Sequence, residues 1–350
     1  MSIIFAILIF SFLIFIHEFG HFITAKLSGV QVNEFSMFMG PAIWKKKKGE
    51  TLYSIRCIPI GGYCAMEGED EVTDNPRCFR KAKWWKQLII LVAGSAMNFI
   101  AGVLIMVIVF MPAKQFITST IAEIEQGSLV GGQYGLQAGD TFLEIDGEKI
   151  YVQSDLSTIL ALNPGDVHDI VVERNGEKVV LNDFEMKKVT FAGEESPRFG
   201  IKFSLEKATF GSKLSYAWKN VLNAGRIVRL SLQMLFNGEA SISDMSGPVG
   251  IIDQMSDVAD ASETKLDAVL NMLYFGGFIA INLAIMNMLP IPALDGGRVL
   301  ALLITTLIVK ITKKPVNPKV EGYIHGVGMV LLLAFMALIM FKDVFTIFTR

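Results

Sequence analysis

The sequence has few charged residues. Asp, Glu, Lys and Arg make up 19% of its 350 residues, against about 25% in soluble globular proteins. Hydrophobic residues reach 52%. The low charge argues against an ordinary soluble enzyme, and the apolar content excludes a disordered chain. The excess of apolar residues predicts a chain embedded in a lipid bilayer.

The sequence also lacks a net charge of either sign and is poor in cysteine. With 32 basic and 34 acidic residues, the formal net charge is −2, which gives no reason to expect a nucleic-acid partner. The three cysteines are Cys57, Cys64 and Cys78, without a CxxC pair. An odd set without such a pair argues against a disulfide framework and against a thiolate zinc site. We expect three reduced thiols.

Four apolar runs are long enough to cross a bilayer, which takes about 20 residues. They cover residues 3–25, 88–111, 268–294 and 322–341. The first run has neither the basic start nor the small-residue cleavage site of a signal peptide. Residues 299–309 are too few to cross and are expected to form a buried or half-inserted helix. The pattern predicts a polytopic α-helical membrane protein with four transmembrane helices.

Loop charges predict the orientation, because basic loops stay in the cytoplasm. Residues 26–86 hold 11 basic and 7 acidic residues, and residues 310–319 hold four lysines and no acid. Residues 113–209 hold 9 basic and 16 acidic residues. We therefore expect both basic loops in the cytoplasm, and both termini and the acidic central region outside.

The central region changes to strand-like alternation. Strands are expected at 117–124, 141–145, 169–174 and 178–181, with a helix at 154–162. Asp146-Gly147 and Asn175-Gly176 are strong hairpin turn signals. The segment QGSLVGGQYGLQAGDTFLEIDGEKI, together with this helix and the segment NPGDVHDIVVERNGE, resembles a bacterial PDZ domain, which implies binding of chain ends by strand addition. A rigid β spacer is the alternative, and His168 is expected on the surface of this insert.

Two further segments flank the spans. Residues 49–66, GETLYSIRCIPIGGYCAM, predict a membrane-associated β-hairpin. Residues 209–236 predict an interfacial amphipathic helix, with a packed connector helix as the alternative. We expect four divisions. Residues 1–112 hold the first two spans and the cytoplasmic hairpin, and residues 113–208 form the extracytoplasmic PDZ domain. Residues 209–265 hold the interfacial helix and the SGPVG segment, and residues 266–350 hold the last two spans with the Leu-Asp-Gly motif.

The first span contains HEFGH. His17 and His21 are four residues apart, so they share one face of a helix and can bind one zinc ion, while Glu18 lies near a metal-bound water. Each strongly polar group within a bilayer costs on the order of 3 kcal/mol, and a bound cation compensates that cost. The motif therefore predicts a zinc site.

A catalytic zinc ion needs a third protein ligand. Asp295, Glu321 and His325 are the candidates near the membrane. Asp295 is favoured, because it follows the third span in NMLPIPALDGGR, where prolines break the helix and glycines let the backbone turn close to another element. Glu321 is also readily explained as an interface anchor.

Several motifs together resemble one family. They are HEFGH, Gly61-Gly62-Tyr63, GSAMN at 94–98, the PDZ-like insert, SGPVG at 246–250 and NMLPIPALDGG. This combination resembles the site-two protease family of intramembrane zinc metalloproteases, in its bacterial RseP and RasP branch. The chain has one PDZ-like insert where the Gram-negative pattern has two.

The resemblance implies Zn²⁺ held by His17, His21 and Asp295, with Glu18 activating water. It implies that Asn282 and Asn287 engage the substrate backbone, although helix–helix hydrogen bonding is the alternative. It also implies that the hairpin with Gly61, Gly62 and Tyr63 holds an unwound substrate as an added strand. Asn98 is interpreted as close helix packing rather than catalysis.

The implied partners are the lipid bilayer and single-span membrane proteins. Such substrates are anti-sigma factors already trimmed by an extracytoplasmic protease, or remnant signal peptides. They would be cut near the cytoplasmic side of a bacterial plasma membrane. Two alternatives are a membrane-anchored PDZ scaffold or chaperone with a structural zinc site, and a metal transporter. Transport predicts polar groups along several spans, and only His325 adds to the cluster.

Overall fold

The computed structural model describes residues 2–69, 73–132, 135–163, 165–191, 193, 196–238, 247–314 and 318–349. Ser246 of SGPVG, Gln133 and Tyr134 of the PDZ-like segment, and Pro164 lie outside the described residues. The chain forms two compact units. Unit 1 comprises Met1–Val109 and Ile227–Arg350, and unit 2 comprises Phe110–Arg226.

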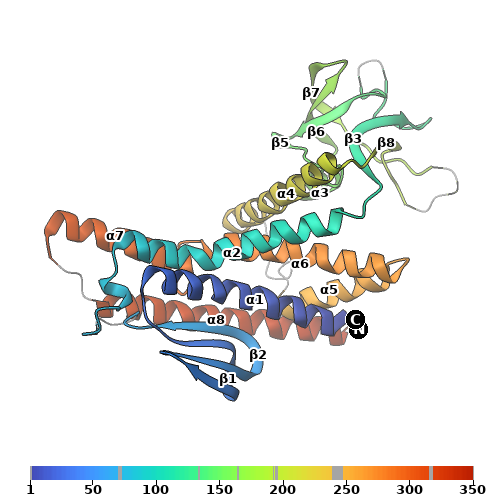
Figure 1. The fold of residues 1–350 in the computed structure, drawn as a ribbon. Coiled ribbons are helices and arrows are strands. Elements are labelled where there is room, and N and C mark those ends of the chain that lie inside the picture. Colours follow the sequence, from blue (N-terminus) through green and yellow to red (C-terminus); the bar gives the residue numbers. More distant parts are fainter. Residues whose placement is uncertain are drawn as a thin grey trace. The chain divides into compact units, whose positions relative to one another are not determined.

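Unit 1 is built on long apolar helices (Figure 1). Its elements are α1 (Ser2–Ser28), η1 (Phe79–Lys81), α2 (Trp84–Phe110), α5 (Pro248–Asp260), α6 (Lys265–Asn287), α7 (Asp295–Thr312) and α8 (Pro318–Thr349). Four helices of the described chain are long and apolar enough to cross a membrane: Ile4–Ser28, Trp84–Phe110, Lys265–Asn287 and Glu321–Thr346. The prediction of four membrane helices is confirmed, and α7 is not among them.

The third membrane helix ends earlier than predicted. It stops at Asn287 instead of reaching residue 294. Pro290 and Pro292 lack the N–H that an α-helix needs, so the apolar run continues without helical hydrogen bonds. The chain then begins a new helix, α7, at Asp295.

Small residues bring the helices of unit 1 together. A Cβ atom at Gly102 of α2 would lie 2.7 Å from Ile281 of α6, and one at Gly276 of α6 would lie 3.0 Å from Ile9 of α1. Packing of this kind replaces the hydrophobic effect as the attraction between helices in lipid. At these two glycines, the absence of a side chain thus makes room for an isoleucine of the neighbouring helix.

The glycines of SGPVG bind a carboxylate. The backbone N–H groups of Gly247 and Gly250 both donate to Oδ2 of Asp343, each at 2.9 Å. These N–H groups lie at the start of α5, where a helix leaves donors unsatisfied. The motif thus fixes the start of α5 to the end of α8.

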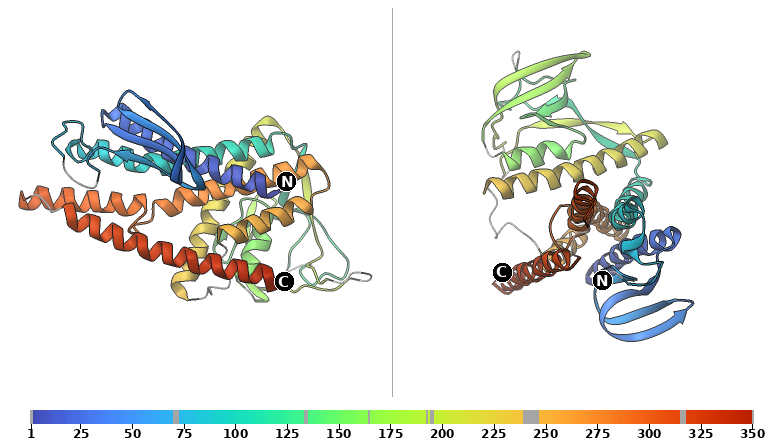
Figure 2. Two further views of the ribbon diagram at one scale, coloured as in Figure 1. Left: turned by 90° about the horizontal axis from the view of Figure 1, so that it is seen from below. Right: turned by 90° about the vertical axis from the view of Figure 1, so that its left-hand side faces the viewer.

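The hairpin is longer than the sequence predicted. It pairs β1 (Val32–Lys48) with β2 (Thr51–Met66), so the predicted range 49–66 covers only its turn and second strand (Figures 1 and 2). The lysine run 45–48 looks like a loop in sequence, yet exposed lysines are compatible with an outer strand. The other end of the hairpin is buried, where Val32 and Phe35 pack with Ala25 of α1 and Ile90 of α2.

The beginning and the end of β2 pair with opposite edges of β1. Glu34 pairs with Leu52 on one side and with Ala65 on the other. The last segment of β2, residues 62–66, consequently has β1 as its one strand neighbour within the described residues. Its second edge is the one that faces away from β1.

Unit 2 contains a six-stranded sheet in the order β7-β6-β4-β3-β8, with β5 paired to β4. The elements are β3 (Gln115–Ile124), β4 (Thr141–Ile145), β5 (Glu148–Lys149), α3 (Ser154–Leu162), β6 (Val167–Arg174), β7 (Glu177–Glu185) and β8 (Ile201–Lys207). All four residues of the two predicted turns, at 146–147 and 175–176, have positive φ, as two-residue hairpin turns require. Strands β5 and β8 were not expected from the sequence.

His168 lies in the interior of unit 2, so the expectation of a surface histidine is wrong. Its exposure is 4%. One ring nitrogen, Nδ1, lies 2.8 Å from Oδ2 of Asp146, and Nε2 lies 3.0 Å from the carbonyl oxygen of Gly165. The partners come from neighbouring turns, which sequence spacing does not reveal.

Residues 209–236, predicted as an interfacial amphipathic helix, form α4 (Phe210–Asn237). Near the middle of α4, Arg226 forms a buried ion pair with Asp155 of α3 at 2.9 Å. The guanidinium also lies 5.1 Å above the ring of Tyr151 and donates to the carbonyl of Lys149. A charge so deeply enclosed depends on its partner.

We predict that Arg226→Ala destabilises unit 2 by about 3–5 kcal/mol, because it leaves the Asp155 carboxylate buried without its cation. Hydrogen exchange of α3 amides in the full protein in detergent measures this free energy of opening. Lys202→Ala is the matched control: its pair with Glu123 is exposed, so the expected loss is about 0–1 kcal/mol. Equal effects of the two variants would contradict the prediction.

Candidate metal centre

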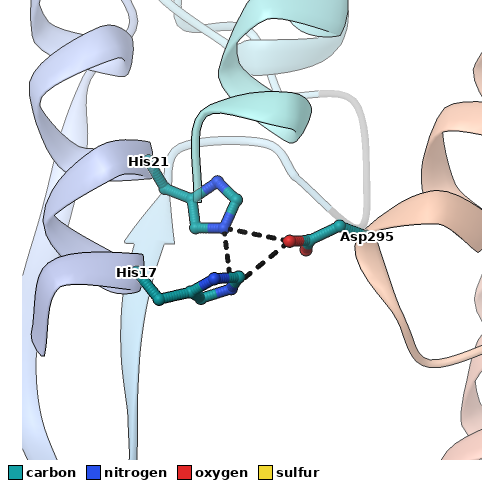
Figure 3. A group of neighbouring side chains, drawn as sticks. All are labelled: His17, His21 and Asp295. Carbon is teal, nitrogen blue, oxygen red and sulfur yellow. Dashed lines mark hydrogen bonds and ion pairs between the residues drawn. The ribbon is translucent and has the colours of Figure 1, made fainter. Parts of the chain in front are cut away.

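Three predicted site residues converge from two elements. His17 and His21 extend from α1 toward Asp295, the first residue of α7 (Figure 3). The distance between the two Nε2 atoms is 3.3 Å. Oδ2 of Asp295 lies 3.3 Å from Nε2 of His17 and 3.4 Å from Nε2 of His21. These side chains form the one metal-type group of His, Cys, Asp and Glu found among the described residues.

The triangle of donor atoms fits a tetrahedral zinc ion. With metal–ligand bonds of about 2.0–2.1 Å, ligand atoms in a tetrahedron lie about 3.3–3.4 Å apart, which matches all three sides. Oδ2 of Asp295 is buried and has no well-formed hydrogen bond within the described residues. The two ring nitrogens and the carboxylate oxygen face one point. Each has an electron pair to donate, so together they would bind a divalent cation.

The break between α6 and α7 positions Asp295. A Cβ atom at Gly296 would collide with the carbonyl of Met288, and one at Gly297 with the carbonyl of Ile291. Glycines let α7 start against this turn. Burial raises the pKa of the Asp295 carboxyl, but the two imidazoles outweigh burial and hold its pKa below the usual value. Asp295 therefore presents a carboxylate to the two histidines.

Glu18 lies on α1 beside strand β2. A Cβ atom at Gly62 would be 3.2 Å from Cγ of Glu18, so a larger residue in the strand would press on this side chain. Gly61 has φ +72°, a conformation that favours glycine. Tyr63 continues the strand, with its ring 5.3 Å from the guanidinium of Arg56. The structure thus brings the Gly-Gly-Tyr segment next to Glu18.

The two predicted asparagines lie on the third membrane helix. Asn282 is within α6, and Asn287 is its last residue. Both are half-buried. Neither side chain forms a hydrogen bond within the part of the chain that the structure describes. Substrate binding and helix–helix hydrogen bonding by these amides therefore both stay predictions.

Glu321 and His325 are not part of the triangle. They line a cavity of about 610 Å³ instead. Glu321 forms an ion pair with Arg80 at 3.0 Å. Nδ1 of His325 accepts a hydrogen bond from the backbone N–H of Ala293 at 3.1 Å.

Comparison with known proteins agrees with this geometry. The chain matches the family described as Peptidase family M50 over residues 5–335. The chain belongs to this family. A candidate zinc metalloprotease of Clostridium acetobutylicum is 36% identical, with 98% of this chain and 97% of the relative covered.

Two relatives in Bacillus carry more specific names. The zinc metalloprotease RasP of Bacillus licheniformis is 27% identical, and the regulator of sigma-W protease RasP of Bacillus subtilis is 25% identical. Each alignment covers 98% of this chain and 98% of the relative. Membership of the M50 family makes the protein an integral membrane zinc metalloprotease, which disfavours a scaffold whose zinc is only structural.

Sequence reasoning missed the groups on α2 that surround the histidines. Nδ1 of His21 lies 2.8 Å from the carbonyl oxygen of Ile90. Nδ1 of His17 lies 3.4 Å from the amide nitrogen of Asn98. A backbone carbonyl leaves no trace in a sequence. Asn98 was a usable signal, because GSAMN at 94–98 places it four residues after Gly94 in a GxxxN pattern.

We predict that His17→Ala, His21→Ala and Asp295→Ala each abolish cleavage and lower the bound zinc, because each removes one of three ligands. Glu18→Gln should abolish cleavage while zinc is retained, since Glu18 is outside the ligand triangle. Elemental analysis of the purified proteins, paired with a cleavage assay, measures both quantities. An Asp295→Ala protein with full zinc content and full activity would remove Asp295 from the site.

Proposed function

We propose that this protease hydrolyses peptide bonds within or beside the transmembrane segment of single-span membrane proteins. The observation that carries the proposal is the triangle of His17, His21 and Asp295 at apolar helices, with Glu18 adjacent. The substrates are anti-sigma factors already trimmed outside, or remnant signal peptides. The name of the Bacillus subtilis relative, a regulator of sigma-W protease, supports the first class.

In this proposal His17, His21 and Asp295 hold Zn²⁺. Bound zinc lowers the pKa of water toward 7 and polarises a peptide carbonyl. Glu18 accepts the proton of the attacking water at its carboxylate and returns it to the nitrogen of the leaving amine. The position of Glu18 beside Gly62 supports this role, because a peptide next to β2 would place its backbone within reach of the carboxylate.

The hairpin is the proposed holder of the substrate. A helical substrate keeps its carbonyl groups in internal hydrogen bonds, so it must unwind before it is cut. Unwound backbone inside a membrane needs new partners. The second edge of residues 62–66 is proposed to offer them. Gly62 and Tyr63 lie in this segment, and Gly61 directly precedes it. The side-chain amides of Asn282 and Asn287, on α6, are proposed to form hydrogen bonds with the substrate backbone.

The proposed setting is a bacterial plasma membrane with the active site toward the cytoplasm. The basic loops at 26–86 and 310–319 support their cytoplasmic location, and the acidic balance of 113–209 supports an outside location. Both termini then lie outside. An extracytoplasmic protease that trims the substrate first is a functional partner.

Unit 2 is proposed to be a PDZ domain that acts as a steric filter. Its mainly antiparallel sheet and the helix α3 support a PDZ domain, as does the match of its turns to the Asp-Gly and Asn-Gly signals. As a filter it keeps bulky ectodomains away from the zinc site. The competing role is recruitment of newly exposed chain ends by strand addition.

We predict that the purified protein in detergent cuts a tagged reporter that has one transmembrane segment of a trimmed bacterial anti-sigma factor. The cut should fall inside or beside that segment, as located by mass spectrometry of the products. Glu18→Gln should give no product above background, because no group would take the proton from water. Release of the same product by Glu18→Gln would refute the proposal.

We further predict that replacing residues 115–207 with a short flexible linker permits cleavage of an untrimmed reporter. The ends are suited to such a linker, since Gln115 pairs directly with Lys207 and the N–H of Ala208 donates to the carbonyl of Lys114 at 2.9 Å. Zinc content should remain unchanged, because the ligand triangle lies in unit 1.

The two roles of unit 2 give opposite results in this deletion protein. A filter predicts cleavage of both reporters, at a rate for the trimmed form near that of the intact protein. A recruiter predicts slow cleavage of the trimmed form and continued refusal of the untrimmed form. The second pattern, in a protein that folds and keeps its zinc, would decide for recruitment.

A further inference from the structure

The register between α1 and α2 places one face of α2 against both histidines. One stripe of α2 carries three residues at successive intervals of four: Ile90, Gly94 and Asn98. Ile90 meets His21 and Asn98 meets His17, in antiparallel order. Between them, a Cβ atom at Gly94 would collide with Nε2 of His21 and lie 2.7 Å from Cε1 of His17.

A histidine that binds metal through Nε2 carries its proton on Nδ1, and this N–H needs an acceptor. For His21 the acceptor is the carbonyl oxygen of Ile90, at 2.8 Å. This hydrogen bond fixes both the tautomer and the direction of the ring. The Nδ1–H group of His17 needs a second hydrogen-bond acceptor in the same way.

The group at Nδ1 of His17 is the side-chain amide of Asn98, at 3.4 Å. Asn98 is 1% exposed, and its Oδ1 atom is buried without a partner among the described residues. The two ends of an amide are interchangeable by a 180° turn. The turned amide directs its oxygen to Nδ1 of His17, so the proton on Nδ1 and the oxygen of Asn98 satisfy each other.

We propose that Asn98 is a positioning residue for His17: its Oδ1 accepts the Nδ1–H of His17 and thereby holds Nε2 toward the metal. This inference rests on the proposed role of His17 as a metal ligand. In this proposal the two ends of the GxxxN motif have different roles. Gly94 lets α2 approach the imidazoles, and Asn98 orients one of them, which goes beyond the close packing expected from the sequence.

The test measures zinc binding by the full chain in detergent, by competition with a fluorescent chelator. Asn98→Leu keeps the shape of the side chain but has no acceptor, and it should weaken zinc binding by roughly 10–100-fold. Asn98→Asp keeps an acceptor and should bind zinc at least as tightly as the unaltered protein. Ser95→Ala is the matched control on α2: Ser95 is 3% exposed, its Oγ has no partner among the described residues, and no change is expected.

The absorption spectrum of bound Co²⁺ is a second readout, because it reports the geometry around the ion. It should be altered in Asn98→Leu and retained in Asn98→Asp. Unchanged affinity and spectrum in a folded Asn98→Leu protein would overturn the inference. If Asn98→Leu does not fold, Asn98→Asp decides, since a folded Asn98→Asp protein that loses zinc binding excludes an acceptor role.

The same experiment distinguishes a failure of the metal site from a failure of the role of Asn98. If the unaltered protein and Ser95→Ala both fail to bind zinc, the proposed metal site itself is wrong. If both bind zinc and only the role of Asn98 fails, the metal site stands and the amide serves packing alone.

Discussion

The close approach of α1 and α2 is the constraint on which the site depends. A Cβ atom at Gly20 would lie 2.5 Å from the carbonyl oxygen of Ala93. A side chain at position 94 would not fit beside the histidines, and Gly94 has none. Polar groups within a bilayer are costly, on the order of 3 kcal/mol each for charged side chains, unless they find partners. The two imidazoles find theirs on α2, at the carbonyl of Ile90 and the amide of Asn98. The contacts that pack α1 against α2 therefore also position the two imidazoles.

A second backbone feature completes the triangle. The chain between α6 and α7 contains prolines that stop one helix, and glycines that let the next begin against the carbonyls of Met288 and Ile291. Irregular backbone at membrane depth is tolerated when it is enclosed by protein or lines a cavity. Here it carries Asp295 to the two histidines, so a helix break that would weaken an ordinary membrane span instead provides the third donor.

Much of this arrangement was predictable from local patterns, and the rest depended on tertiary contacts. Two histidines four residues apart and four long apolar runs are local signals, and the structure bears out the helices that they indicate. Strand β1 was hidden because Lys45–Lys48 resembles a solvated loop, although its exposed lysines fit an outer strand. The burial of His168 was missed since its partner, Asp146, lies 22 positions away. No periodicity reports such pairings.

In the proposed mechanism, the neighbouring positions of Glu18 and Gly62 connect unwinding of a substrate to its hydrolysis. A peptide inside the membrane loses its helical hydrogen bonds when it is extended, and a strand edge restores them without water. If the edge were far from the carboxylate, an extended substrate would be stabilised but not cut. Because Gly62 has no side chain, the strand lies close to Glu18: a Cβ atom added at Gly62 would be 3.2 Å from Cγ of Glu18. In the proposed mechanism, Gly62 thus stands where the bound backbone and the proton acceptor meet.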